Sequence, residues 1–351
     1  AFGLALATGI PIVPGSFRDG IAYLLDFQWN IAQRQEVTVS FIEPGSASSL
    51  SDLRHLPGVI SAQPFRTVPV RLRFGHRWRR LAVTGIPRDA MLQRVLDDQA
   101  QPIELPADGL LVSAKLAEVL GAKPGDRLRL EVQEGLRPIR EAVIQGVITD
   151  FMGIGAYMEI GALRRLMREG GTISGAHLAV DRARWSEFLA SVKEAPRIAT
   201  LGIKAASRKA FEKSTGDMLG TITTIYFTFA VIVSFGVVYN SARIALSERS
   251  RDLATLRVVG FTQGEVAGVL IIELALLTLI AIPAGFWIGS QLATFIVTTT
   301  GTETIRLPLI LTSQSYASAV LVVLISATLS FALVSRRIRE LDMIGVLKAR
   351  D

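Results

Sequence analysis

The sequence of 351 residues contains no cysteine and only three histidines. The lack of cysteine excludes disulfides and thiolate metal sites, and it leaves the redox environment open. His55, His76 and His177 lie far apart in the sequence, without the short spacing of paired metal ligands. The sequence also lacks a G-x-x-x-x-G-K-[ST] phosphate loop and a G-x-S-x-G nucleophile elbow. We therefore expect no catalytic residue, no metal and no cofactor on this chain.

Charge is missing from three long stretches in the last third of the sequence. Residues 218–242, 274–302 and 307–335 contain no charged side chain, whereas a membrane-spanning helix needs only about 20 apolar residues. Half of all residues are hydrophobic, and the mean hydropathy is +0.40. The predicted spanning helices lie near 219–242, 266–293 and 315–335.

A further apolar run, AFGLALATGIPIVPGSF, opens the chain without an initiator Met or a basic flank. A secretory signal would carry positive residues before its apolar core. We interpret this run as the C-terminal part of a first membrane helix, and we expect the chain to be a fragment of a longer polypeptide.

Basic residues indicate the orientation. The loop after the second span carries Arg243, Arg249, Arg251 and Arg257, and the C-terminal tail carries five more basic residues. By the parity of the spans both segments lie on one side, which the positive-inside rule predicts to be cytoplasmic. The large region 18–217 then lies outside.

That outer region contains two strand-helix-strand units. One lies in EVTVSFIEPGSASSLSDLRHLPGVISAQPFRTVPVRL and the other in GAHLAVDRARWSEFLASVKEAPRIATLGIK. Two such units separated by an insertion, about 71–172, indicate a split βαβ, ferredoxin-like core. The insertion itself is expected to be β-rich, with a short helix that ends at Gly121. The predicted fold class is an α+β membrane protein, with one partial and three full spans and a large extracytoplasmic α+β domain.

The run RLRFGHRWRR, Arg71 to Arg80, is the most basic short segment. One interpretation is a binding site for nucleic acid or anionic lipid. The other, which we favour, is a hairpin that turns near Gly75 and places alternate arginines on a solvated face. Outside a membrane we expect no nucleic acid, so the candidate targets are an anionic lipid headgroup and the acidic surface of a partner.

The stretch ALSERSRDLATLRVVGFTQGEV lies between the second and third predicted spans. Residues 243–259 are compatible with a helix that has Leu246, Leu253 and Leu256 on one stripe, and Glu248 can pair with Arg251 on the same face. A flexible tether would need neither feature. The pattern favours a rigid lever that docks its apolar side on a cytoplasmic partner.

The end of this lever is marked by two signals. Gly260 is placed as the C′ glycine that ends a helix. Thr262 and Glu265 then have the T-x-x-E spacing of a capping box, with Phe261 and Val266 at the positions of a hydrophobic staple. We therefore predict a sharp break followed at once by a new helix.

The run S-E-R-x-R-D-x-A-x-L-R-x-x-G, followed by an apolar helix with an early Glu, resembles the FtsX-like permease family of ABC transporters, of the MacB/LolC/LolE type. The resemblance covers nearly the whole chain, and it implies a location in the bacterial inner (cytoplasmic) membrane. It also implies that this chain is no enzyme, because ATP and Mg bind a separate ATPase subunit. In that family the segment after the second span is a coupling helix that contacts the ATPase. The residues implied here are Ser247, Glu248, Arg249, Arg251, Asp252, Leu253, Leu256 and Arg257, with Gly260 as the break.

Three further residues stand out in the apolar segments. Glu273 is an ionisable group within a predicted span, where a charge is costly, and helix packing, coupling to the lever or simple tolerance would explain it. Gly285 and Gly289 form a small-xxx-small face suited to close helix packing, and they are a weak indication of a seam between two copies.

These observations predict a permease subunit that couples ATP hydrolysis by a partner to motion of the outer domain, for export or extraction of a hydrophobic or lipid-linked substrate. Expected partners are an ABC ATPase, a second permease module (a homodimer or the other half of a longer chain), a periplasmic adaptor or fusion protein, and membrane lipids, with no nucleic acid. One alternative is a transmembrane regulator that activates an extracytoplasmic enzyme. Another is a receptor with an outer sensor domain, which the short tail after Ser335 disfavours.

The expected organisation follows the chain from the first span to the tail. The segments are a partial first span at 1–17, an amphipathic connecting helix at 18–36, the extracytoplasmic domain at 37–206, the second span with its lead-in at 207–242, the coupling helix at 243–262, the third span at 263–296, an outer loop at 297–314, the fourth span at 315–335 and a cytoplasmic tail at 336–351.

Overall fold

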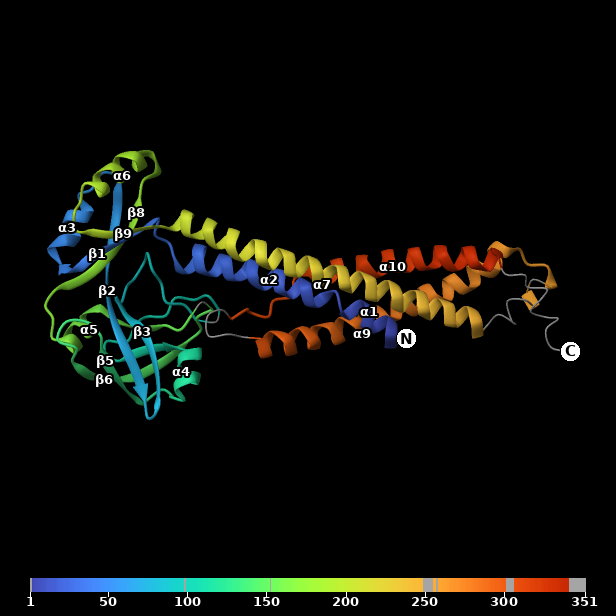
Figure 1. Ribbon diagram of the computed structural model, residues 1–351, viewed down its shortest axis with the longest axis horizontal. Coiled ribbons are helices and arrows are strands. Elements are labelled where there is room, and N and C mark those ends of the chain that lie inside the picture. The colour runs from blue at the N-terminus through green and yellow to red at the C-terminus, as the bar shows by residue number, and fades with distance from the viewer. Residues whose placement is uncertain are drawn as a thin grey trace. The chain divides into compact units, whose positions relative to one another are not determined.

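The computed structural model describes residues 2–97, 99–151, 153–248, 255–256, 258–300 and 306–340. These residues form two compact units (Figure 1). The helical unit comprises the described residues within Ala1–Tyr23, Gly216–Gly301 and Leu307–Asp351, and the α+β unit comprises those within Leu24–Thr215 and Thr302–Arg306.

The helical unit is built from long apolar helices. Its elements are α1 (Phe2–Gly9), most of α2 (Ile12–Asp26), the C-terminal part of α7 (Lys204–Glu248), α9 (Gln263–Thr300) and α10 (Ser313–Glu340). Three segments are long and apolar enough to cross a membrane: Gly220–Ala245, Ala275–Thr299 and Ser313–Leu333. The three full spans predicted from the sequence are thereby confirmed. Each helix is longer than its apolar run, because the flanking polar residues also favour helix.

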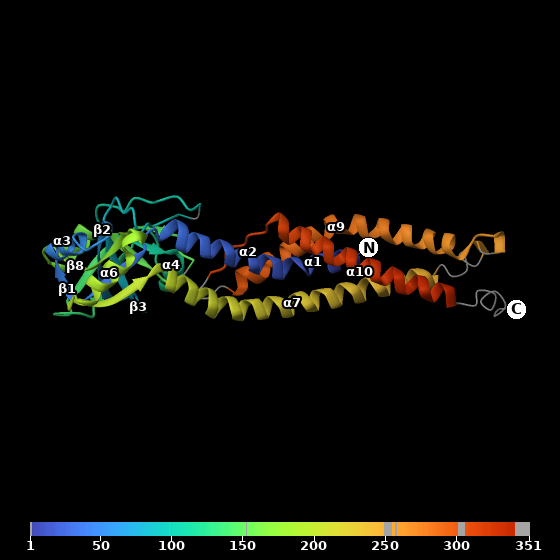
Figure 2. The same cartoon turned by 90° about the horizontal axis from the view of Figure 1, so that it is seen from above.

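The short helix α1 lies at the centre of this unit. Leu4 and Ala5 form one buried cluster with Val238 of α7, Ala281 of α9 and Ala327 of α10. Figure 2 shows α1 running alongside these helices. The first apolar run is therefore a packed part of the bundle.

The chain breaks between α1 and α2 at Pro11. Proline has no N–H to donate, and its ring excludes the carbonyl four residues earlier, which here belongs to Ala7. That carbonyl accepts a hydrogen bond from the Ser234 hydroxyl at 2.7 Å, and both residues are buried. A neighbouring helix thus satisfies the backbone group that the proline releases.

Close packing of α1 on α9 depends on glycine. A Cβ atom on Gly285 would lie 2.7 Å from the Ala5 carbonyl oxygen. One on Gly289 would lie 2.6 Å from the Gly9 carbonyl oxygen and 2.6 Å from Ile12 Cδ1. Both distances are too short for any side chain, so the two backbones approach as closely as small residues allow.

The α+β unit has a split βαβ core, as the sequence predicts. Its strands lie in the order β2-β8-β1-β9, all neighbours being antiparallel. Val37, Val39, Leu178 and Phe188 are fully buried on the helix-covered face. The core elements are β1 (Val37–Ser46), α3 (Ser48–Arg54), β2 (Val59–Phe74), β8 (Thr172–Val180), α6 (Trp185–Lys193) and β9 (Ile198–Ile203), with a π-helix at Phe27–Ala32 and a 3-10 turn at Arg182–Arg184.

The insertion is β-rich, as expected, and its strands close into a ring. The order β3-β7-β4-β6-β5-β2 returns to its start because β3 pairs with β2 as well as β7. The short helix predicted before Gly121 is present, and Gly121 takes a positive φ of 70° at its end. The inserted elements are β3 (Arg77–Ile86), β4 (Leu110–Ser113), α4 (Ala114–Leu120), β5 (Arg127–Val132), β6 (Ile139–Ile148), β7 (Ala156–Glu159) and α5 (Ile160–Met167).

The strand β2 belongs to both sheets, and Arg66 lies where it passes from one to the other. Its side chain is only 2% exposed. The guanidinium donates two hydrogen bonds to Glu169, at 2.9 and 2.7 Å, and further bonds to Glu134 and to the Ser174 hydroxyl. Glu134 and Glu169 belong to the insertion and Ser174 to the core, so one buried cation joins the two halves of this unit.

A buried histidine lies in the core sheet. The His177 ring is within 3.1 Å of the Thr38 hydroxyl, and its centroid lies 4.7 Å from that of Phe65. Burial lowers the pKa of His177 from 6.5 to about 4. The imidazole is therefore uncharged at neutral pH, and His177 contributes to the packing of the core sheet.

Two changes to Gly285 and Gly289 test the packing of α1 on α9. Replacing either residue by Val should lower the unfolding temperature of the detergent-solubilised chain by several degrees, because the added methyl groups must push α1 away. Gly236→Val in α7 is the matched control, since no atom lies within 4 Å of its Cβ position. Equal stability of all three variants would contradict this packing.

The buried imidazole predicts a pH effect. Between pH 6.5 and about 4 the unfolded chain binds a proton at residue 177 that the folded chain does not bind. The free energy of unfolding should therefore fall as the pH decreases through this window, by up to about 3 kcal/mol in total. Thermal unfolding of the wild-type chain and of His177→Gln, from pH 7 to pH 4, measures the difference. Parallel curves for the two proteins would show that the imidazole is protonated in the fold.

Candidate functional site

The segment between α7 and α9 is the candidate site that the sequence singles out. Ser247 and Glu248 are exposed and form the last two residues of α7. The helix thus continues past residue 243, where the coupling helix was expected to begin, because no helix-breaking residue occurs there. Leu256 is half-buried and helical. The remaining implied contacts lie outside the described residues: Arg249, Arg251, Asp252, Leu253 and Arg257.

The turn that follows is closed by backbone hydrogen bonding. Gly260 has a φ of +112°, which side-chain-bearing residues rarely adopt. The Phe261 N–H donates to the Leu256 carbonyl at 3.1 Å, across five residues. This is the bond that ends a helix in a Schellman motif with glycine at C′.

The next helix begins two residues later with a reciprocal cap. The Thr262 N–H and hydroxyl both donate to the Glu265 carboxylate, at 2.7 and 2.8 Å, and the Glu265 N–H donates back to the hydroxyl at 3.4 Å. These bonds from Thr262 lower the pKa of Glu265. Val266, at the staple position, is fully buried. Both ends of the turn are therefore fixed by their own local interactions.

The polar and small residues of α9 have distinct environments. Glu273 is half-buried and precedes Ala275, the first residue of the membrane-crossing segment. It therefore lies at the edge of the span rather than at its centre. Gly285 and Gly289 face α1 of the same chain, so this face is already occupied and gives no support to a seam between two copies.

A buried carboxylate that the sequence analysis overlooked lies in α2. Asp19 is 7% exposed and accepts hydrogen bonds from the Thr312 N–H at 2.9 Å, the Thr312 hydroxyl at 2.7 Å and the Ser315 hydroxyl at 2.7 Å. Thr312 immediately precedes α10, so Asp19 caps the start of that helix from another helix, where its dipole favours negative charge. The signal was present in SFRDG, an acidic residue at the end of an apolar run that had no assigned partner.

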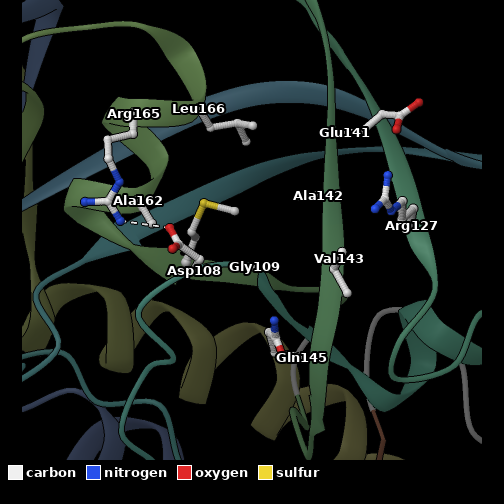
Figure 3. A pocket seen from close by; sticks show the side chains of 11 residues that line it. Asp108, Gly109, Arg127, Glu141, Ala142, Val143, Gln145, Ala162, Arg165 and Leu166 are labelled. Carbon is white, nitrogen blue, oxygen red and sulfur yellow. Dashed lines mark hydrogen bonds and ion pairs between the residues drawn. The ribbon is translucent and has the colours of Figure 1, made fainter.

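The α+β unit contains a cavity of about 400 Å³ beside β6 and α5 (Figure 3). Met158, Ala162 and Leu166 give it an apolar part. At its rim Arg165 donates to the Asp108 carboxylate at 2.8 Å. No nucleophile lies beside a base among its lining residues. Within the described part of the chain, no three His, Asp or Glu side chains come together as metal ligands would.

The match to a known protein family lies almost entirely in the helical unit. Residues 224–343 match the family model described as FtsX-like permease C-terminal. Comparison with curated proteins gave no match.

Two solved structures are similar to parts of the chain. One is the extracellular domain of the noncanonic ABC-type transporter YknZ from Gram-positive bacteria, which is 13% identical, with a TM-score of 0.33. The alignment covers 47% of this chain and 99% of the YknZ domain. The other is the periplasmic region of MacB from Actinobacillus actinomycetemcomitans, which is 12% identical, with a TM-score of 0.35. The alignment covers 53% of this chain and 98% of the MacB region.

The matched region begins within α7 and runs through α9 and α10, so it contains all of the turn at Gly260 and nearly all of the three segments able to cross a membrane. The chain is a multi-pass membrane protein that carries an FtsX-like permease C-terminal domain over residues 224–343.

Proposed function

We propose that this chain is the permease subunit of an ABC transporter and that the segment between α7 and α9 receives mechanical work from a separate ATPase. The observation that carries the proposal is the turn at Gly260, closed by the Phe261 to Leu256 bond and followed directly by the Thr262 and Glu265 cap. A tether between two spans needs neither of these devices. A lever that transmits force needs both, because it must keep a fixed angle to the helix that it moves.

The length of α7 suits such a lever. It has 45 residues, or about 68 Å at 1.5 Å per residue. The hydrocarbon core of a bilayer is about 30 Å thick, so a large part of the helix projects beyond the membrane. In this proposal Ser247 and Glu248 lie in the cytoplasm and Lys204 lies outside. Because α7 is one unbroken helix, a push at its cytoplasmic end would reach its first residue, Lys204.

Motion of one helix would also be passed to its neighbours in the helical unit. The glycine contacts hold α1 against α9. The Ser234 hydroxyl joins α7 to the Ala7 carbonyl, and Asp19 joins α2 to the start of α10. Because packed interfaces shift as units and do not deform continuously, the bundle would move as a small number of rigid pieces.

In this proposal ATP and Mg bind only the partner ATPase, and the α+β unit lies outside the bacterial inner membrane. The substrate class is hydrophobic or lipid-linked, which suits a domain that pushes or extracts and does no chemistry. A second permease module completes the transporter, and an adaptor or fusion protein is a further partner.

Substitutions in the segment between α7 and α9 test the coupling. Glu248→Ala with Arg251→Ala, or Leu253→Asp alone, should lower recovery of the cognate ATPase with the detergent-solubilised permease by about tenfold, because contacts of an interface centre are lost. ATP turnover of the assembled complex should lose its dependence on the permease. Lys209→Ala, near the other end of α7, is the control. Unchanged recovery and turnover in the first two variants would show that the segment is only a tether between two spans.

The cap gives a second, local test. Thr262→Val removes the hydroxyl from the capping box, which costs about 1 kcal/mol for a typical N-cap. Amide hydrogen exchange at residues 263–266 should become about fivefold faster, and permease-dependent ATP turnover should fall. Thr228→Val, which loses a hydroxyl bonded to the Thr224 carbonyl within α7, should leave the exchange at 263–266 unchanged. If Thr262→Val speeds exchange but turnover stays the same, the fixed angle is not needed for coupling.

A further inference from the structure

The outward side of the ring of strands in the α+β unit carries an array of arginines. Along β2 the even-numbered residues Val68, Val70 and Leu72 are buried, so the odd-numbered residues point outward. The pairing registers of β2 with β3 and β5 bring the outward residues of the three strands side by side. The array consists of Arg71 and Arg73 on β2, Arg80 on β3, and Arg127 and Arg129 on β5.

The two-residue turn at Gly75 and His76 aligns this array. Phe74 pairs with Arg77, and Gly75 has a φ of +57°. The interpretation of the run from Arg71 to Arg80 as a hairpin is thereby confirmed. Its alternate arginines Arg71, Arg73 and Arg80 do share the outward face, but there like charges are opposed across the strands.

Arg71 lies directly opposite Arg80, and Arg73 directly opposite Arg129. Like charges in such positions destabilise a sheet. Glu131 is the main counter-charge, and its carboxylate is shared among Arg71, Arg73 and Arg129 at 3.4, 3.6 and 3.9 Å. With Glu141 opposite Arg129 on β6, two carboxylates face five guanidinium groups. The array therefore keeps an excess of positive charge.

Trp78 lies within the array on β3, opposite Arg73, and is 41% exposed. The guanidinium carbons of Arg71 and Arg80 lie 4.8 and 5.9 Å from the centroid of its ring. The Nε atoms of Arg71 and Arg73 are shielded from solvent and have no hydrogen-bond partner among the described residues. Arg71 and Arg80 are thus held beside the indole by cation–π contacts, and the Nε atoms of Arg71 and Arg73 add two donors, unpaired within the described part of the chain, beneath the surface.

We propose that this arginine array is a docking surface for the acidic surface of a protein partner. Arg and Trp are the residues most enriched at the energetic centres of protein interfaces, and a guanidinium binds a carboxylate through two parallel hydrogen bonds. Within the array, Arg127 lines the cavity beside β6 and α5, whereas Arg71, Arg73 and Trp78 lie on the outward side of β2 and β3. An outward strand surface with several arginines in register suits a protein better than a small anion, which binds in a concave site.

The spacing also matches acidic side chains of a protein. Opposed residues on neighbouring strands have Cβ atoms about 5 Å apart, and alternate residues along a strand are about 7 Å apart. Carboxylates at alternate positions of a strand, or four apart on a helix at about 6 Å, repeat with similar spacings. This inference does not depend on the proposed function, because the coupling segment belongs to the helical unit.

The test uses the full chain in an uncharged detergent and a fluorescein-labelled peptide of alternating Glu and Ala as the acidic probe. Fluorescence anisotropy should show binding that weakens steeply with salt. Arg73→Glu combined with Arg129→Glu should weaken it by about 30-fold. The control, Arg54→Glu combined with Arg197→Glu, changes the net charge equally at the end of α3 and in the turn before β9, and should weaken binding by less than about threefold.

Two further variants keep the test decisive. Trp78→Ala leaves the charge unchanged and should weaken binding by about tenfold, which general electrostatic attraction would not do. Arg73→Gln with Arg129→Gln replaces the charge-reversed pair if thermal unfolding shows that pair to be misfolded. Equal loss in the array and control variants, or unchanged binding in Trp78→Ala, would overturn the proposal. It would also be overturned if phosphatidylglycerol vesicles bind through the array and the peptide does not, since the target would then be a membrane.

Discussion

A backbone amide or carbonyl cannot be left unpaired in hydrocarbon, and outside it the free groups of a helix end are paired by a cap; the helical unit shows one turn of each kind. Between α1 and α2, Pro11 leaves the Ala7 carbonyl without its helical partner. The hydroxyl of Ser234, on another helix, donates a hydrogen bond to it. At Gly260 the turn closes through its own backbone and the following cap. The first break is stabilised by a neighbouring helix, whereas the second is stabilised by hydrogen bonds within its own residues.

Contacts between distant residues hold other parts of each unit in place. Glycines that face α1 leave no room for relative motion of α1 and α9, and the Asp19 cap fixes the start of α10. In the α+β unit, Arg66 holds the insertion to the core through two glutamates and a serine. Losing one partner of such a buried ion pair costs more than the pair contributes, so these joints keep each unit intact.

The two binding surfaces that we propose lie on stable elements or follow directly from them. The arginine array is held on β2, β3 and β5, and the coupling segment starts at Ser247 and Glu248, the last residues of α7. Neither contains a group placed for catalysis. In the proposed function this chain contributes position and rigidity, and the partner ATPase hydrolyses ATP.

The sequence by itself determined the features that arise from local interactions. Uninterrupted apolar runs predicted three spans, the T-x-x-E spacing predicted the cap at Thr262, and Gly260 predicted the end of the preceding helix, because each depends on one continuous stretch of the chain. Two βαβ patterns likewise indicated the core sheet and its insertion. Only the tertiary structure decided which distant residues meet. Asp19 at the start of α10, α1 on Gly285 and Gly289, Arg66 between Glu134 and Glu169, and the opposed arginines of β2 and β5 all join positions that no local periodicity connects.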